Sequence, residues 1–292
     1  MLRLYDTARG EVLDLDPRDA RRLSMYVCGP TVYDLPHLGH GRYTLVWDVA
    51  RRWFSFRGLE VRFVSNITDI DDNIINRALR EGSSEAEVAR RFEDEWWRAM
   101  TALGVARPDD TPHATQFVAS MVDLIASFLR DDIAYTISDG VYFDTSRVSD
   151  YGLLAGQSLD SLRAGARVEA SEEKRSPLDF ALWKFAKAGE PSWPAPFGDG
   201  RPGWHTECVV MSLGLLGDGF DLHSGVLRSS SKRAPTVSTN SAARPEKWWS
   251  PCRTKSPPAR RGSAKRRAKA SSRTSARSAS AMVTGVTSIG ER

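Results

Sequence analysis

Hydrophobic positions in the first part of the chain alternate between short continuous runs and a helical period. The runs predict buried strands at residues 24–28 and 61–65, each bounded by turn-forming residues. Between them, apolar residues recur every three or four positions over 38–57 and Gly58 follows, which predicts an amphipathic helix and its end. A second helix is predicted to begin near 69–72, where carboxylates suit a helix N-terminus. This order of elements is typical of a parallel α/β sheet.

Two further helices are predicted downstream. Ser84 and Glu87 have the spacing of a capping box, ahead of a helix that Gly104 closes. A second amphipathic pattern covers residues 117–128, with its apolar side chains on one face. Both helices therefore have one face to bury against a neighbouring layer.

The pattern changes in the middle of the chain. Apolar segments on either side of Ser138-Asp139-Gly140 predict a hairpin, and mostly polar sequence follows. A helical pattern resumes after Gly203, and an apolar segment ending at His223 predicts a return to the sheet. We interpret residues 105–200 as an insertion between two halves of one α/β domain.

Composition narrows the class of protein. The 292 residues are 41% hydrophobic and 27% charged, as in a globular protein, and they include no apolar run of 18 residues. The first residues lack an apolar signal core, so we expect a cytoplasmic protein and no membrane span. Cys28, Cys208 and Cys252 are too widely spaced for a disulfide framework, which leaves metal binding or simple burial.

The net charge of +4 conceals an uneven distribution. Residues 226–292 hold 16 Lys and Arg against two Asp and Glu, whereas residues 1–225 hold 25 against 35. Hydrophobic periodicity also ends at Gly225, and the Ser-, Arg- and Ala-rich sequence that follows cannot bury an apolar core. We therefore expect 226–292 to be a disordered basic tail.

The most informative candidate chemistry lies in the sequence Cys28-Gly-Pro-Thr-Val-Tyr-Asp-Leu-Pro-His37-Leu-Gly39-His40. It joins a predicted strand to a predicted helix, and the backbone N–H groups and helix dipole at such a turn attract phosphate. His37 and His40 add hydrogen-bond donors, and Gly39 allows close approach of a ligand. The four residues His-Leu-Gly-His alone have a simpler interpretation, a surface helix start with two solvated histidines.

A second candidate is the acidic sequence Asn66-Ile-Thr68-Asp-Ile-Asp-Asp72. Its carboxylates could hold a hard metal ion or could simply cap a helix, and the residues alone favour capping. Cys28 and Cys208 are a third candidate. Buried free cysteine is the ordinary fate of such residues, but each lies at a predicted strand end or helix start, where a thiolate is favoured.

Four blocks in order resemble the cysteinyl-tRNA synthetase family: CGPTVYD with HLGH, NITDIDD, GRPGWHTEC and GFDLHSG. The resemblance covers about residues 1–225. It implies an α/β fold of the class I synthetase type, in which a Rossmann-like parallel sheet carries an inserted α+β connective segment and is incomplete at its C-terminal end. Residues 1–104 would form the first half of the catalytic domain, 105–200 the connective insertion, and 201–225 the start of the second half, before the tail at 226–292.

The resemblance also assigns site residues. His37, Gly39 and His40 would hold ATP, and the two histidines would be catalytic because their donors stabilise charge that builds as pyrophosphate leaves. Cys28 and Cys208 would bind Zn²⁺. The thiolate of the substrate would complete the metal shell, which selects cysteine over serine because zinc prefers sulfur.

The substrate pocket follows from the same blocks. By resemblance, L-cysteine would lie near Gly29, Thr68, Trp204 and His223. The implied reaction is ATP-dependent activation of L-cysteine to cysteinyl-adenylate, followed by transfer to tRNA(Cys), in a protein expected to be a monomer.

The chain departs from the family after His223. Family members continue with Phe-Pro-His-His-Glu-Asn-Glu, which supplies the remaining zinc ligands, whereas this chain reads Val226-Leu-Arg-Ser-Ser-Ser-Lys-Arg-Ala. The family's Lys-Met-Ser-Lys-Ser loop, which grips the ATP phosphates, and its tRNA-reading helical domains are also missing from the sequence. We therefore expect this chain to be inactive or impaired.

Three alternatives stay open. A sister ligase of mycothiol-type biosynthesis, which joins cysteine to glucosaminyl-inositol, shares the fold, although it typically reads Cys-Gly-Ile-Thr-Pro-Tyr-Asp where this chain has Cys28-Gly-Pro-Thr-Val-Tyr-Asp34. A non-catalytic RNA-binding protein would use the basic tail on phosphates. A non-functional fragment would follow from our hypothesis of a frameshift near codon 225, to which a genuine basic extension is the competing interpretation.

Overall fold

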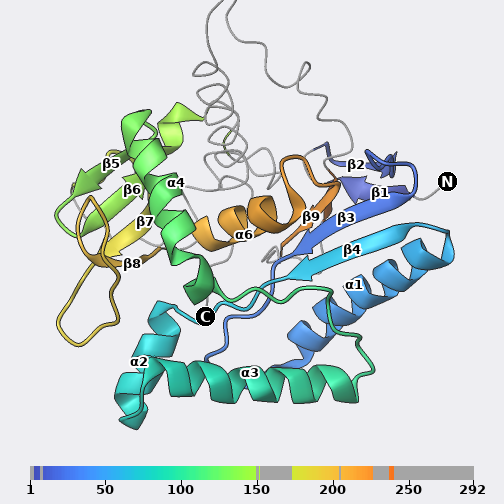
Figure 1. The fold of residues 1–292 in the computed structure, drawn as a ribbon, viewed down its shortest axis with the longest axis horizontal. Coiled ribbons are helices and arrows are strands. Elements are labelled where there is room, and N and C mark those ends of the chain that lie inside the picture. Colours follow the sequence, from blue (N-terminus) through green and yellow to red (C-terminus); the bar gives the residue numbers. More distant parts are fainter. Residues whose placement is uncertain are drawn as a thin grey trace, which may run out of the picture.

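The computed structural model describes residues 3–6, 9–148, 151, 173–203 and 205–225, and the backbone of 237–239. Two sheets organise these residues (Figure 1). The larger sheet has the strand order β2-β1-β10-β9-β3-β4. Its strands are β1 (Arg3–Asp6), β2 (Glu11–Asp14), β3 (Arg22–Val27), β4 (Glu60–Ser65), β9 (Leu222–Ser224) and β10 (Val237–Thr239).

The centre of the larger sheet is parallel, as the sequence pattern predicted. β3 pairs in parallel with β4 on one side and with β9 on the other. The helix α1 (Leu38–Phe56) makes the crossover from β3 to β4. Because successive side chains of a strand point to opposite faces, Met25 and Val27 of β3 pack with Trp47 of α1, whereas Tyr26 faces the opposite layer.

The helix α6 (Thr206–Leu216) belongs to that opposite layer. Its Cys208 and Met211 share a buried cluster with Tyr26 and Cys28, and Phe220 belongs to the same cluster. The sheet is therefore covered on one face by α1 and on the other by α6 (Figure 1). This arrangement is the reason that residues at the carboxyl ends of β3 and β9 lie beside the first turn of α6.

The helices α2 (Asp72–Glu81) and α3 (Glu85–Ala102) continue the first half of the fold. The predicted capping box is confirmed, because Ser84 N–H donates to Glu87 and Glu87 N–H donates back to the Ser84 hydroxyl. The buried faces of both helices form a cluster with Val32 and Ile67. Residues 110–113 then run beside β4 and its continuation, with parallel bridges from Val64 to Asp110 and from Ile67 to His113.

The middle of the chain forms a separate antiparallel sheet of order β5-β6-β7-β8. The predicted hairpin is confirmed as β5 (Ala134–Ile137) and β6 (Gly140–Phe143). The sheet packs against the helix α4 (Val118–Arg130) and Val209 of α6 (Figure 1). The other elements of this part are β7 (Phe180–Phe185), β8 (Gly200–Pro202) and the short 3₁₀ helices η1 (Ala114–Phe117) and η2 (Thr145–Arg147).

The tail requires one correction. It was predicted to contain no regular structure, but the backbone of 237–239 forms β10, antiparallel to β9 and parallel to β1. The local sequence Thr236-Val237-Ser238-Thr239 is rich in β-branched residues, which favour strands. The rest of 226–292 lies outside the described residues. No helix within the described part of the chain is long and apolar enough to cross a membrane.

Candidate functional site

The turn after β3 is held against the loop after β4 by backbone contacts. Thr68 N–H donates to the Pro30 carbonyl at 2.9 Å, and Val32 N–H donates to the Thr68 carbonyl at 3.2 Å. Gly29 N–H donates to the Asn66 side chain at 2.9 Å. A Cβ atom at Gly29 would lie 1.6 Å from the Asn66 carbonyl oxygen, so only glycine permits this approach.

Asn66 connects this turn to Thr68, one of the predicted substrate residues. The Asn66 amide donates to the Thr68 hydroxyl at 3.1 Å, and that hydroxyl donates to Glu207 of α6 at 3.4 Å. All three side chains are buried. Burial raises the pKa of Glu207 well above its usual value, and the neighbouring Cys208 and Asp71 raise it further. Three sequence blocks therefore meet at Thr68.

The two histidines of HLGH begin α1 and cap it. His37 is the N-cap residue, and its Nδ1 accepts from Gly39 N–H at 3.0 Å. His40 Nδ1 accepts from His37 N–H at 3.2 Å, which completes a capping box. An Nδ1 atom that accepts carries no proton, so each neutral ring has its proton on Nε2. Both Nε2–H groups remain as donors at the N-terminus of a helix, which suits an anion.

The two rings also fix each other in place. The His37 and His40 rings stack with centroids 3.9 Å apart, and Trp96 of α3 meets His40 edge-on at 5.5 Å. A Cβ atom at Gly39 would lie 2.7 Å from His37 Cε1, so a larger residue would displace the ring. Burial, and then the neighbouring His37, lower the pKa of His40 to about 4. His40 is therefore neutral at physiological pH.

The predicted metal ligands lie together. Cys28 directly follows β3, Cys208 lies in the first turn of α6, and their Sγ atoms are 3.5 Å apart. His223 of β9 is the register partner of Tyr26, and its Nε2 lies 3.7 Å from Cys28 Sγ. Burial lowers the pKa of His223 to about 4, so its ring is neutral.

The surroundings of Cys208 work against the expectation that these positions favour a thiolate. The hydrogen bond with Cys28 and burial raise the pKa of Cys208 well above its usual value. Two buried sulfur atoms this close cannot both be charged without a cation between them. The helix N-terminus alone does not overcome this repulsion.

The geometry fits Zn²⁺ in part. Two thiolates bound to one tetrahedral zinc ion at about 2.3 Å lie about 3.8 Å apart, close to the observed separation of the two sulfur atoms. Within the described ranges, however, no group of three or more His, Cys, Asp and Glu side chains is arranged to hold a metal ion. Cys28 and Cys208 would therefore supply two ligands and not a closed shell.

The acidic residues of the second block have structural partners. Asp69 accepts from Thr115 N–H at 2.9 Å and from its hydroxyl, and Asp71 caps α2 by accepting from Asn73 N–H at 2.8 Å. Asp72 forms ion pairs with Lys184 of β7 and, at 2.6 Å, with Arg201 of β8. The capping interpretation therefore holds. Asp72 in addition joins α2 to the antiparallel sheet of β5 to β8.

Tyr43 links the start of α1 to the sulfur atoms of Cys28 and Cys208. It lies one turn after His40, and its hydroxyl donates to the Ser224 carbonyl at 3.4 Å. The same carbonyl accepts from Cys28 N–H at 2.9 Å. The start of α1 and the sulfur pair are thus tied to one point at the end of β9. Trp204 lies outside the described residues, so its predicted place in the pocket stays a prediction.

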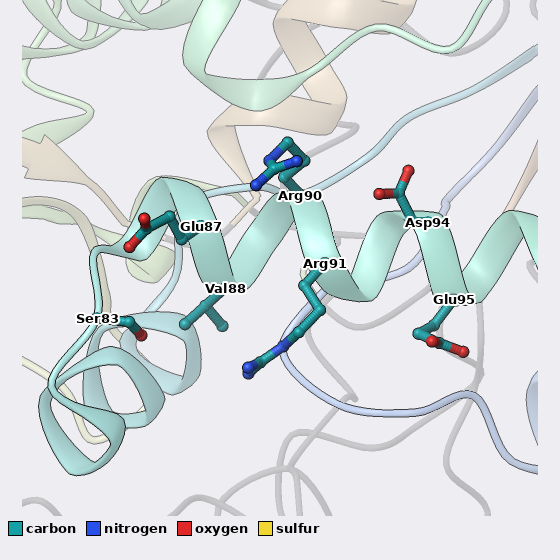
Figure 2. A pocket seen from close by; sticks show the side chains of 7 residues that line it. All are labelled: Ser83, Glu87, Val88, Arg90, Arg91, Asp94 and Glu95. Carbon is teal, nitrogen blue, oxygen red and sulfur yellow. The ribbon is translucent and has the colours of Figure 1, made fainter.

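The hollow shown in Figure 2 lies away from this site. It has a volume of about 500 Å³ and contains none of the predicted site residues. Arg90 and Asp94 leave α3 on one side, and Arg91 and Glu95 leave it on the other (Figure 2). Ligand pockets are mostly apolar, so this charged helix surface is not a competing site.

Sequence reasoning missed several residues that build the site. Asn66 was part of a recognised block, but its contact with Gly29 was not predicted. Glu207 and Tyr43 were not singled out, although Glu207 directly precedes a predicted metal ligand. Asp221 accepts from Arg18 N–H, Ser24 N–H and the Ser24 hydroxyl, which anchors the loop before β9.

The fold and this site define a catalytic domain of the class I aminoacyl-tRNA synthetase type, in which a parallel sheet leads into a His-Leu-Gly-His helix start. Residues 14–228 match the family model for the class I (C) tRNA synthetase catalytic domain, and the chain belongs to this family. The recognition made from the four sequence blocks is thereby confirmed.

Curated relatives agree with the family. The chain is 48% identical over 226 residues to the cysteine–tRNA ligase of Dechloromonas aromatica (strain RCB), which covers 77% of this chain and 50% of the relative. It is 47% identical over 224 residues to that of Thermotoga maritima, covering 77% of this chain and 49% of the relative. The chain thus spans about half the length of the curated relatives it matches.

Among solved structures, the chain is similar to methionyl-tRNA synthetase from Mycobacterium tuberculosis in complex with methionyl-adenylate. The TM-score is 0.46 and the sequence identity 15%, and the match covers 68% of this chain and 47% of that one.

Proposed function

We propose that the chain carries the amino-acid-activating site of a cysteine–tRNA ligase. In this reaction the carboxylate of L-cysteine attacks the α-phosphorus of ATP, pyrophosphate leaves, and cysteinyl-adenylate forms. The cysteinyl group is then transferred to the terminal ribose of tRNA(Cys). The proposed substrates are therefore ATP, L-cysteine and tRNA(Cys), bound by a monomer. One observation carries the proposal. Cys28, Cys208 and His223 lie together at the carboxyl ends of β3 and β9, and the chain leads from this end of β3 into the His-Leu-Gly-His start of α1.

The nucleotide end of the site would act through hydrogen bonding. With both Nδ1 atoms engaged by the backbone, the Nε2–H groups of His37 and His40 can donate to phosphate oxygens. Gly39 keeps the helix start narrow enough for close approach. These donors are fixed before the substrate arrives, so they can stabilise the charge that develops on the phosphates with little reorganisation.

The amino-acid end of the site would act through sulfur recognition. Cys28 and Cys208 are the residues that would hold Zn²⁺, and a bound zinc ion would prefer the thiolate of cysteine to the hydroxyl of serine. The Thr68 hydroxyl already donates to Glu207 and accepts from Asn66, so its remaining lone pair can accept from the ammonium group of the substrate. Gly29, Trp204 and His223 complete the proposed pocket.

We expect turnover to be impaired in this chain. The sequence after His223 has no histidine and no Lys-Met-Ser-Lys-Ser string to hold the phosphates from the other side. Positioning and charge stabilisation supply most of the rate in phosphoryl and adenylyl transfer. Loss of one set of phosphate contacts should therefore slow adenylate formation far more than it weakens substrate binding.

Cysteine-dependent exchange between ATP and pyrophosphate tests the proposal, with bound zinc measured on the same sample. We expect exchange at or near background and less than one zinc ion per chain. Zinc that is bound should disappear in Cys28→Ser, and stoichiometric zinc in that variant would contradict the assignment of the ligands. Rapid exchange that depends on L-cysteine would show that the chain is active and would contradict the expected impairment.

A further inference from the structure

Cys28 and Cys208 are a pair of buried thiols whose chemistry does not depend on a metal. Their Sγ atoms are 3.5 Å apart, although the residues are separated by 180 positions in the chain. Both cysteines are free, with 9% and 6% of their surfaces exposed. We propose that in the metal-free chain this pair is a redox couple that closes reversibly into a disulfide on exposure to a peroxide.

The geometry requires only a small movement. A disulfide bond is about 2.05 Å long, so the two sulfur atoms need to approach by about 1.5 Å. Each cysteine sits on a fixed backbone. Cys28 N–H donates to the Ser224 carbonyl at 2.9 Å, and Cys208 lies in the first turn of α6. The two sulfur atoms therefore start close to bonding distance, on backbone that other contacts already hold.

The surroundings distinguish the two sulfur atoms. His223 Nε2 lies 3.7 Å from Cys28 Sγ, so a polar side chain neighbours this sulfur. Cys28 is also the more exposed of the pair. We therefore assign Cys28 as the sulfur that reacts with the peroxide and Cys208 as the sulfur that resolves the product.

The chemistry balances with one peroxide molecule. The Cys28 sulfur attacks one oxygen of hydrogen peroxide, the O–O bond breaks, and sulfenic acid forms at Cys28 while water leaves. The Cys208 sulfur then attacks the Cys28 sulfur, the S–S bond forms, and the S–O bond breaks. The departing hydroxide takes the Cys208 proton and leaves as a second water. Two thiols lose two electrons and two protons, and the peroxide accepts both.

The disulfide would affect the proposed site directly. Oxidation uses the two sulfur atoms that the proposed function assigns to Zn²⁺, so the oxidised chain could hold neither the metal nor the substrate thiolate. The disulfide would join the end of β3 to the start of α6, the two elements that carry the sulfur atoms. Metal binding and disulfide formation would therefore exclude each other.

The test uses the full chain, reduced, freed of metal with a chelator and then treated with one equivalent of hydrogen peroxide. The chain has three cysteines, so we expect free thiols to fall from three to one, with Cys252 still free. Non-reducing digestion and mass spectrometry should find Cys28 and Cys208 in one linked pair of peptides, reversed by dithiothreitol. Persistence of three thiols, or links that join Cys252 as often as Cys208, would overturn the proposal.

Three controls separate this pairing from unselective oxidation. Chain unfolded in guanidinium should lose the selectivity for the pair, and added zinc should slow the reaction of the folded chain. In Cys208→Ser, dimedone should trap sulfenic acid at Cys28, and trapping at Cys252 instead would contradict the assignment. None of these readouts requires adenylate formation, so they stand apart from the test of the proposed function.

Discussion

The His37 and His40 rings stack at the start of α1 with centroids 3.9 Å apart, and each ring accepts a backbone N–H through Nδ1. This arrangement satisfies two helix-terminal N–H groups and at the same time fixes both rings in the Nε2–H tautomer. The sequence His-Leu-Gly-His therefore serves as a helix cap and as a pair of preset donors. The geometry that caps the helix is therefore also the geometry that the proposed phosphate binding would use.

Removal of either ring should weaken binding of ATP. We expect His37→Ala or His40→Ala to raise the dissociation constant of ATP about tenfold, because each change removes a donor to a charged acceptor and part of the cap. Isothermal titration measures the effect, and His113→Gln is the matched control, since His113 pairs with Glu93 outside the site. Equal loss of binding in the His113 variant would contradict the assigned role.

Stability should depend on pH through His40. Burial and His37 lower the pKa of His40 to about 4 in the folded chain, whereas the unfolded value is about 6.5. Between these values the unfolded chain binds more protons, so the free energy of unfolding should fall as pH drops from about 6.5 to about 4. The His40 contribution is fully present above that window. NMR titration of the ring should give a midpoint near 4, and a midpoint near 6.5 would contradict the half-buried, stacked position.

Gly29 should tolerate no side chain. Gly29→Ala would place Cβ 1.6 Å from the Asn66 carbonyl oxygen, which forces the two loops apart. We expect a loss of about 3 kcal/mol in the free energy of unfolding, measured by urea denaturation. Gly214→Ala in α6 is the matched control. Its Cβ would meet Phe117 at 3.7 Å, an ordinary contact, so the change should be neutral or slightly stabilising.

Asp221 should be a strong determinant of stability. Its carboxylate accepts three hydrogen bonds from Arg18 and Ser24, at 2.9, 2.7 and 2.6 Å. Asp221→Ala leaves these donors without their acceptor, and we expect a cost of about 3 kcal/mol. Asp123→Ala, on the exposed side of α4, should change stability by less than about 0.5 kcal/mol. Similar losses in both variants would show that the Asp221 contacts contribute little.

Much of the first half of the fold could be predicted from the sequence. The helix α3 has a capping box at Ser84 and Glu87 and a strongly apolar face, and both signals are local. The strands β3 and β4 begin or end within two residues of the predicted runs. By contrast, the hairpin of β1 and β2 was missed, because its short strands are mostly exposed and carry no clear alternation.

The residues proposed for the site could be named from the sequence, but their contacts could not. Cys28 and Cys208 came from the resemblance, and their separation of 3.5 Å follows from the packing of α6 on the face of the sheet that carries Tyr26. The Asp221 contact with Arg18 joins residues 203 positions apart, and no local pattern encodes it. The strand β10 was missed for the same reason. Its pairing depends on the free sides of β9 and β1, which the tail sequence alone does not reveal.

Binding of a non-reactive analogue of cysteinyl-adenylate tests the central claim most directly, because such a molecule engages the histidine end and the sulfur end of the site without any turnover. Cysteinyl-sulfamoyl-adenosine and its seryl counterpart would be titrated into the reduced chain supplied with zinc. We predict that the cysteinyl analogue binds at least about tenfold more tightly, which corresponds to about 1.4 kcal/mol. Equal affinities, or no binding of either analogue, would contradict the claim that the chain assembles one cysteine-specific adenylate site.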